Sequence, residues 1–93
     1  MQQSHPQVIL NGTLMSSNQA LIPATSEGCL LGCGLFETLR VHARQVAFAK
    51  AHWERFTRSA GTLGYHLPQG FDATLEQSRQ LIEANDFSEG AIR

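Results

Sequence analysis

The chain has 93 residues, of which 42% are hydrophobic and 16% charged, and seven Lys and Arg stand against eight Asp and Glu. This composition favours one globular domain and excludes a disordered chain, and the balanced charge argues against a nucleic-acid partner. No apolar run approaches the roughly 20 residues of a membrane span, and we expect no signal peptide because the amino end is polar. Two cysteines in such a chain predict free thiols and a cytoplasmic location.

The first predicted element is a β-hairpin. Residues 8–10 and 13–15 flank Asn11-Gly12, and this dipeptide suits a two-residue type I′ turn because both residues tolerate positive φ angles. The polar, turn-prone residues 16–26 predict a loop. Residues 27–34 that follow are apolar and rich in glycine.

Two further strands are predicted in the middle of the chain. Residues 35–41 favour a strand because their composition suits a pleated surface, and a short turn leads to a second strand over residues 45–49. Residues 91–93 look like the start of another strand.

Two helices are predicted between these strands. Residues 51–64 indicate a helix that ends at Gly64, and Asp72 is a suitable N-cap for a second helix that runs to about Ala84. Strands and two helices in this order predict an α+β fold with an antiparallel sheet, in one domain over residues 1–93.

The faces of the predicted elements suggest where a ligand binds. On the first helix an apolar stripe is predicted to face the core, formed by Trp53, Phe56, Ala60 and Leu63. A basic and hydroxyl row that could hold an anion borders this stripe, formed by His52, Arg55 and Ser59. The alternative for this row is an ordinary surface on which Arg55 extends its charge into water.

The predicted strand over residues 35–41 also has two faces. One face carries Leu35, Glu37, Leu39 and Val41. The other face carries Phe36, Thr38 and Arg40, and this combination of aromatic, hydroxyl and guanidinium groups suits the wall of a pocket for a small anionic ligand. The alternative is a mixed, solvent-facing surface.

Two tempting motifs do not hold. Gly32-Cys33-Gly34 begins like a dinucleotide-binding loop, but Glu37 stands where the third glycine belongs and the segment precedes a strand instead of following one. Cys29 and Cys33 lack the spacing of a zinc ribbon and have no second pair, so we expect no metal site and predict buried, structural thiols.

Two segments occur in a characteristic order: Gly32-x-Gly34-Leu35-Phe36-Glu37-Thr38-Leu39-Arg40-Val41 and, after a turn and a strand, His52-x-x-Arg55-Phe56-x-x-Ser59-Ala60-x-x-Leu63-Gly64. With the amino-terminal hairpin, this series resembles the small domain of fold-type IV pyridoxal-phosphate enzymes. These are the class IV aminotransferases, which include branched-chain and D-amino-acid aminotransferases and aminodeoxychorismate lyase.

The resemblance implies roles for individual residues. Arg55 matches the family arginine that binds the phosphate of pyridoxal phosphate, a role that suits a planar fork of donors. The strand residues Phe36, Thr38 and Arg40 match the positions that line the substrate side of the cofactor. The family branch with a branched-chain substrate usually has glycine at the position of Thr38, so the resemblance favours the lyase or the D-amino-acid branch.

The sequence also departs from the family pattern. Ser26-Glu27 stands where family members commonly have Asp-Arg, Cys33 replaces an aspartate between the two glycines, and Leu31 replaces an aromatic residue. These differences change the substrate pocket and predict either a divergent specificity or a decaying gene.

The resemblance further implies that the large catalytic domain, with its Schiff-base lysine, lies beyond position 93. Lys50 is the one lysine of the chain, and it does not match the catalytic lysine of the family. We therefore expect no covalent binding of pyridoxal phosphate and no activity from this chain alone. The resemblance implies that the complete enzyme acts on an amino acid or aminochorismate.

Family enzymes are homodimers, which predicts self-association of the chain. The alternative function is a non-catalytic dimerising or ligand-binding domain from a truncated gene.

Overall fold

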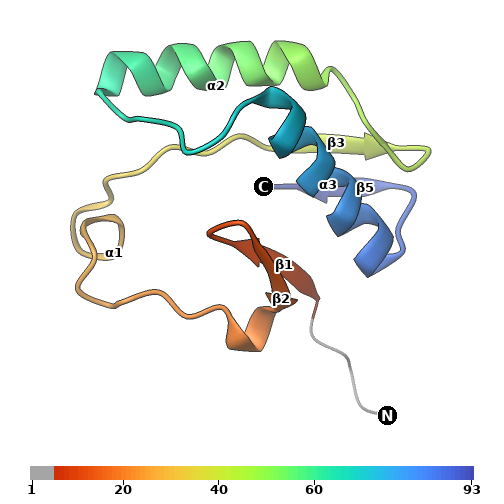
Figure 1. Ribbon diagram of the computed structural model, residues 1–93, viewed down its shortest axis with the longest axis horizontal. Coiled ribbons are helices and arrows are strands. Elements are labelled where there is room, and N and C mark those ends of the chain that lie inside the picture. The colour runs from red at the N-terminus through yellow and green to blue at the C-terminus, as the bar shows by residue number, and fades with distance from the viewer. Residues whose placement is uncertain (1–5) are drawn as a thin grey trace.

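The computed structural model describes residues 6–93 and has an α+β fold (Figure 1). Its elements in chain order are β1 (Gln7–Leu10), β2 (Thr13–Ser16), the 3₁₀ turn η1 (Ser17–Gln19), α1 (Glu27–Leu31), β3 (Leu39–His42), β4 (Gln45–Val46), α2 (Ala49–Leu63), α3 (Phe71–Asn85) and β5 (Gly90–Ile92). β1 and β2 form one antiparallel sheet, and β4, β3 and β5 form a second in that order. The predicted fold class is confirmed, with α1 as an additional short helix.

The predicted hairpin is present at the amino end. Leu10 pairs with Thr13, so Asn11 and Gly12 alone form the turn. Their φ angles of 51° and 83° are both positive, as a type I′ turn requires. Local turn chemistry therefore determines the register of β1 and β2.

The strand predicted over residues 35–41 is shorter in the structure, where β3 covers Leu39–His42. β5 pairs with residues 39–41 and β4 with residues 41–42, so residues 35–38 have no strand beside them to complete a ladder. The alternation of faces nevertheless continues through these residues. Leu35, Glu37 and Leu39 are half-buried, and the residues between them are exposed.

The second strand is also shorter than predicted, since β4 ends at Val46 instead of residue 49. Phe48 has a left-handed backbone with φ 54°, which ends the extended conformation and allows α2 to begin at Ala49. The end of this helix is as predicted, because Gly64 has φ 76° and its N–H donates to carbonyls of the last turn.

The N-cap of α3 lies two residues before the predicted one. Gly70 is the N-cap, and Asp72 lies within the first turn, where its negative charge is favourable beside the positive end of the helix dipole. At the other end, the Asn85 side chain accepts from the Gln7 N–H at 2.7 Å and donates to the Gln7 carbonyl at 3.0 Å. This pair of hydrogen bonds fixes β1 against α3.

The core lies where α2 and α3 meet the three-stranded sheet. Val41, Ala60 and Ile82 are fully buried there, and the ring of Trp53 lies 6.2 Å from both Phe56 and Phe71, which joins the two helices. The predicted stripe on α2 is only partly correct. Ala60 is buried and the aromatic residues are half-buried, but Leu63 in the last turn is 55% exposed because no other element covers it.

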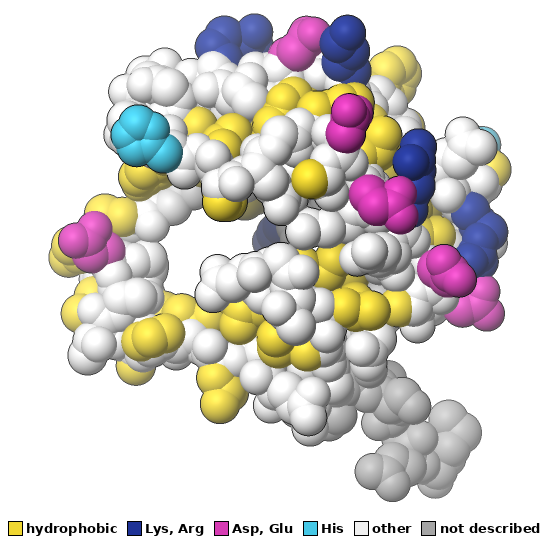
Figure 2. Space-filling model, viewed as in Figure 1, with side chains coloured by type: hydrophobic (Ala, Val, Ile, Leu, Met, Phe, Trp, Pro, Cys, Tyr) yellow, Lys and Arg dark blue, Asp and Glu magenta, His cyan; other side chains and the backbone are white. Residues whose placement is uncertain are grey.

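Residues 20–36 form an extended arm that carries α1 away from the helices and the sheet (Figure 1). Large apolar side chains along the arm are 61–79% exposed: Leu21, Ile22, Leu30, Leu31 and Phe36. Cys29 and Cys33 are also exposed, so the prediction of buried thiols is wrong. The reason is that, among the described residues, no other element packs on residues 27–34, all of which are exposed. Figure 2 shows an opening between the arm and the rest of the molecule.

The arm increases the overall dimensions of the chain. The radius of gyration is 14.3 Å, whereas a compact domain of this length would have about 12 Å. Within residues 6–93 no helix combines the length and the apolar character that a membrane crossing requires.

Candidate functional site

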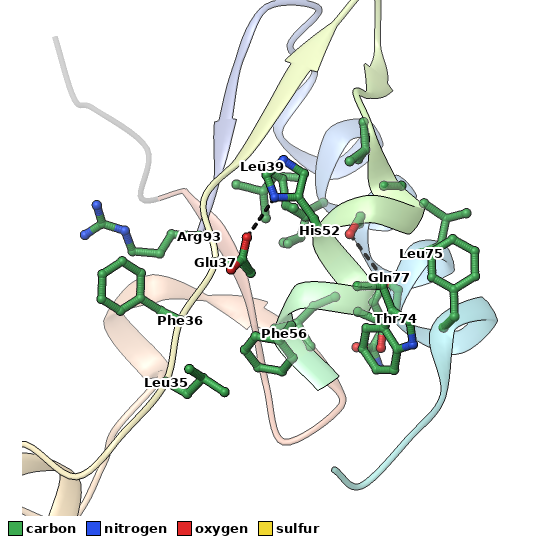
Figure 3. Close-up of a pocket in the computed structure, with 18 residues that line it drawn as sticks. Leu35, Phe36, Glu37, Leu39, His52, Phe56, Thr74, Leu75, Gln77 and Arg93 are labelled. Atoms are coloured by element: carbon green, nitrogen blue, oxygen red, sulfur yellow. Dashed lines mark hydrogen bonds and ion pairs between the residues drawn. The ribbon is translucent and has the colours of Figure 1, made fainter. Parts of the chain in front are cut away.

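A groove of about 460 Å³ opens between α2, α3, β1 and the extended segment before β3 (Figure 3). Most of its lining is apolar: Ile9, Leu35, Phe36, Leu39, Val46, Ala49, Trp53, Phe56, Phe71, Leu75, Leu81 and Ile92. A small number of polar side chains also line it, and two of them, Glu37 and His52, point toward each other (Figure 3).

Glu37 is the centre of a three-residue cluster that joins the extended segment to α2. Its Oε1 accepts from His52 Nδ1 at 2.7 Å and from Arg55 Nη2 at 2.6 Å. Its Oε2 accepts from Arg55 Nε at 3.1 Å, so the guanidinium binds both carboxylate oxygens. We call Glu37, His52 and Arg55 the carboxylate cluster.

The sequence places these three residues together for simple geometric reasons. Glu37 lies on the inward face of the alternating segment, with Leu35 and Leu39 on either side. His52 and Arg55 are three residues apart on α2 and therefore face the same side of the helix. When α2 packs beside the extended segment, the carboxylate meets both donors.

The contacts of the carboxylate cluster change its acid–base properties. Hydrogen bonds from Arg55 and then His52 stabilise the ionised carboxylate and lower the pKa of Glu37 from 4.5 to about 2. The same ion pair raises the pKa of Arg55 above its ordinary value. Glu37 is therefore a permanent anion and Arg55 a permanent cation at neutral pH.

The two partners of Glu37 differ in their exposure. The side chain of Glu37 is 16% exposed and that of His52 is 23% exposed, whereas that of Arg55 is 59% exposed. Arg55 thus presents its remaining N–H groups to solvent while two of its donors hold Glu37. An oriented, half-exposed guanidinium of this kind is suited to bind an anion.

The structure brings together part of the predicted anion-binding row. His52 and Arg55 meet on Glu37, while the half-buried Ser59 lies one turn further along α2 and, among the described residues, makes no hydrogen bond to the cluster. Sequence reasoning missed the role of Glu37. The available signal was a carboxylate on an otherwise apolar strand face, which requires a partner when it is buried.

The predicted pocket wall of Phe36, Thr38 and Arg40 lies on the opposite face of the segment from Glu37, and all three residues are exposed. Phe36 borders the groove and stacks beneath the guanidinium of Arg93, which lies 5.0 Å from its ring centroid. Figure 3 shows this pair beside the segment, away from His52. The contact of this face with a substrate stays a prediction.

Lys50 is exposed in the first turn of α2 and is not part of the groove lining. Within residues 6–93, no group of three or more His, Cys, Asp or Glu side chains is placed to hold a metal ion. The chemistry of the described residues is therefore concentrated in the carboxylate cluster.

Comparisons with known proteins identify similar sequences. Residues 34–93 match the family model described as amino-transferase class IV. The D-alanine aminotransferase of Staphylococcus aureus (strain N315) is 33% identical over 85 residues, which are 91% of this chain and 30% of that protein. The aminodeoxychorismate lyase of Bacillus subtilis (strain 168) is 28% identical over 86 residues, which are 92% of this chain and 29% of that protein.

A solved structure is similar as well. The crystal structure of a Legionella pneumophila protein assigned as a 4-amino-4-deoxychorismate lyase superimposes with a TM-score of 0.65 and 39% sequence identity. The match covers 69% of this chain and 24% of that one. The chain thus spans about 30% of the length of the curated relatives that it matches.

Proposed function

Because the chain belongs to the amino-transferase class IV family, we propose that it forms the amino-terminal part of a pyridoxal-phosphate-dependent aminotransferase or 4-amino-4-deoxychorismate lyase. Its substrate would be an amino acid or aminodeoxychorismate. The observation that carries the proposal is the carboxylate cluster, in which Glu37 fixes the half-exposed guanidinium of Arg55 beside an apolar groove.

The residues of the cluster fit the phosphate group of this cofactor. The guanidinium of Arg55 uses Nε and Nη2 on Glu37, and it retains further donors in a planar arrangement that suits phosphate oxygens. Pyridoxal phosphate, when bound, supplies a ring that accepts electrons and so stabilises negative charge on an amino substrate.

Each residue of the cluster has a distinct part in this proposal. Arg55 binds the phosphate, and Glu37 restricts the rotation of Arg55 so that less entropy is lost when the phosphate binds. His52 donates a second hydrogen bond to Oε1 of Glu37 and so prevents the carboxylate from turning away from Arg55. Because Glu37 and His52 are largely buried, water competes little for these hydrogen bonds.

The lysine that would carry the cofactor lies outside residues 1–93 in this proposal. Lys50 is exposed and does not line the groove, and the relatives are more than three times as long as the segment they share with this chain. Activity would therefore require a second, lysine-bearing domain.

The exposed arm supports a proposal of self-association. Association that covers its large apolar side chains lowers the free energy, because exposing apolar surface to water is unfavourable. A homodimer in which the arm packs against a second copy would provide that surface.

The phosphate assignment can be tested on this chain by NMR titration with inorganic phosphate and with pyridoxal phosphate. We expect both to shift the Arg55 Nε–H signal and the His52 ring signals. Because Arg55→Ala also removes the Arg55 signal, the two variants are compared by the His52 ring signals. Arg55→Ala should abolish their shift, whereas Arg58→Ala should keep it, because Arg58 is exposed on the same helix three residues further along. An equal shift of the His52 signals in both variants would remove the assignment.

In an enzyme that contains this chain and a lysine-bearing domain, Arg55→Ala should weaken cofactor retention by about tenfold or more, since a charge-assisted hydrogen bond is lost. Arg58→Ala should leave retention unchanged. Equilibrium dialysis against pyridoxal phosphate measures both.

A non-catalytic dimerising or ligand-binding domain is the second candidate. The observation that favours it is the apolar groove and arm, which are interaction surfaces even without catalysis. The nucleotide sequence after the codon of Arg93 distinguishes the two: an open frame that encodes a lysine-bearing domain supports the enzyme, and a stop codon supports the binding domain.

A further inference from the structure

Two exposed thiols lie close together in sequence on the arm. Cys29 is in α1 and Cys33 follows its C-cap, and these are the two cysteines of the chain. Both thiols are free and exposed to solvent, so small oxidants have access to them. Neither residue takes part in the carboxylate cluster or lines the groove.

The backbone after α1 turns back toward the start of the helix. Gly32 has φ 68°, and the N–H groups of Gly32 and Cys33 are both directed at the carbonyl of Glu27, with the Cys33 nitrogen 3.5 Å from it. A Cβ atom placed on Gly28 would lie 3.4 Å from the carbonyl oxygen of Cys33. Cys33 therefore folds back against the first turn of α1, beside the residue that precedes Cys29.

α1 offers little resistance to a local adjustment. It has five residues, none of them buried, and its side-chain cap is a long hydrogen bond of 3.4 Å from the Cys29 N–H to Ser26 Oγ. Helices this short have little stability of their own in water. The backbone can thus adopt the roughly 4.4–6.8 Å Cα separation that a disulfide requires without disturbing the core.

We propose that Cys29 and Cys33 are a peroxide-sensitive thiol pair that closes an intramolecular disulfide across the end of α1. One thiolate attacks the O–O bond of hydrogen peroxide, takes one oxygen as a sulfenic acid and releases water after protonation. The second thiolate attacks that sulfur, forms the S–S bond and expels the oxygen as a second water. Two thiols are oxidised to one disulfide, and one peroxide is reduced to two waters.

The short separation gives the intramolecular reaction a large advantage over cross-linking of two chains. Thiols joined by a short flexible segment meet at an effective concentration on the order of millimolar. For chains that are not associated, at about 10 μM, the intramolecular disulfide should therefore exceed the intermolecular one by about a hundredfold.

The test uses the reduced 93-residue chain at several micromolar concentrations, treated with one equivalent of hydrogen peroxide, quenched with iodoacetamide and measured by intact mass spectrometry. We expect a monomer that is lighter by two hydrogen atoms and cannot be alkylated, and we expect it to be the main product at every chain concentration. Dithiothreitol should restore two alkylation sites. A product dominated by disulfide-linked dimers would overturn the proposal.

Cys29→Ser and Cys33→Ser are the matched controls. Each should give no intramolecular product, and each should accumulate sulfenic acid, higher oxides or, at high chain concentration, cross-linked dimers. If the wild-type chain merely collects the oxides seen in the two variants, with no disulfide, the two thiols act independently and the proposal is wrong.

Discussion

The segment from Glu37 to Val41 and the arm are neighbours in the chain but differ in how their apolar side chains are used. In the segment, every second residue turns inward: Glu37 binds two residues of α2 and is 16% exposed, and Val41 is fully buried. In the arm, Leu30, Leu31 and Phe36 are at least 65% exposed. The difference shows that composition alone does not bury a side chain; a second element must lie opposite it.

The largest expected effect is on the free energy of unfolding, and it is measured by truncating one apolar side chain to alanine in each region. Val41→Ala removes two fully buried methyl groups and should lower the free energy of unfolding by about 2 kcal/mol. Leu31→Ala removes more atoms, but from a side chain that is 72% exposed, and it should change the free energy by less than about 0.5 kcal/mol. Urea denaturation followed by circular dichroism measures both, and equal losses would show that the arm is packed in solution.

Local sequence signals predict those parts of the molecule whose conformation depends on nearby residues. The turn at Asn11-Gly12, the end of α2 at Gly64 and the alternation around Glu37 all follow from backbone preference or from period two. The shortening of β3 could not be predicted in this way, because it depends on where β5 lies some 50 residues later.

The candidate site was likewise only half predictable. The spacing of His52 and Arg55 predicts that they share one face of the helix. Their hydrogen bonds to Glu37 could not be predicted, because they depend on how α2 packs against a different segment. The exposure of Cys29 and Cys33 was missed for the same reason, since a buried position requires a covering element and none of the described elements covers residues 27–34.

The second prediction concerns the arm in solution. We expect the chain to self-associate at micromolar concentration through the exposed arm, and the double variant Leu30→Ser, Leu31→Ser should weaken association by about tenfold or more. Sedimentation velocity over a concentration series measures this. A wild-type chain that stays monomeric throughout would show that the arm needs no second copy.

The third prediction concerns the acid limb of stability. The folded pKa of Glu37 is about 2, below its ordinary 4.5, so the unfolded chain takes up the proton more readily. The cluster therefore contributes stability that is fully present above about pH 4.5 and is lost as the pH falls toward 2. Glu37→Gln should lack this dependence, so the two stability curves should converge between these pH values.

The control for this experiment is Glu54→Gln, which removes the same charge from the exposed side of α2. Its stability curve should run alongside that of the wild-type chain through the same pH interval. If Glu37→Gln also runs parallel to the wild type, the ion pair with Arg55 does not form in solution.

The smallest expected effect is at Lys50, where pyridoxal phosphate should give no specific covalent product. An amine that reacts with this aldehyde at neutral pH generally needs burial or a neighbouring cation to be partly neutral, and the ring needs an oriented partner. Lys50 is exposed in the first turn of α2 and lies outside the groove lining, so neither the burial nor the orientation is provided. Borohydride reduction of the mixture, followed by peptide mass spectrometry, should find substoichiometric labelling that is shared with the amino terminus.

Arg55→Ala should leave that labelling unchanged, because Lys50 reacts independently of the phosphate contact. A stoichiometric adduct on Lys50 at low cofactor concentration, lost in Arg55→Ala, would instead place a complete cofactor site within these 93 residues.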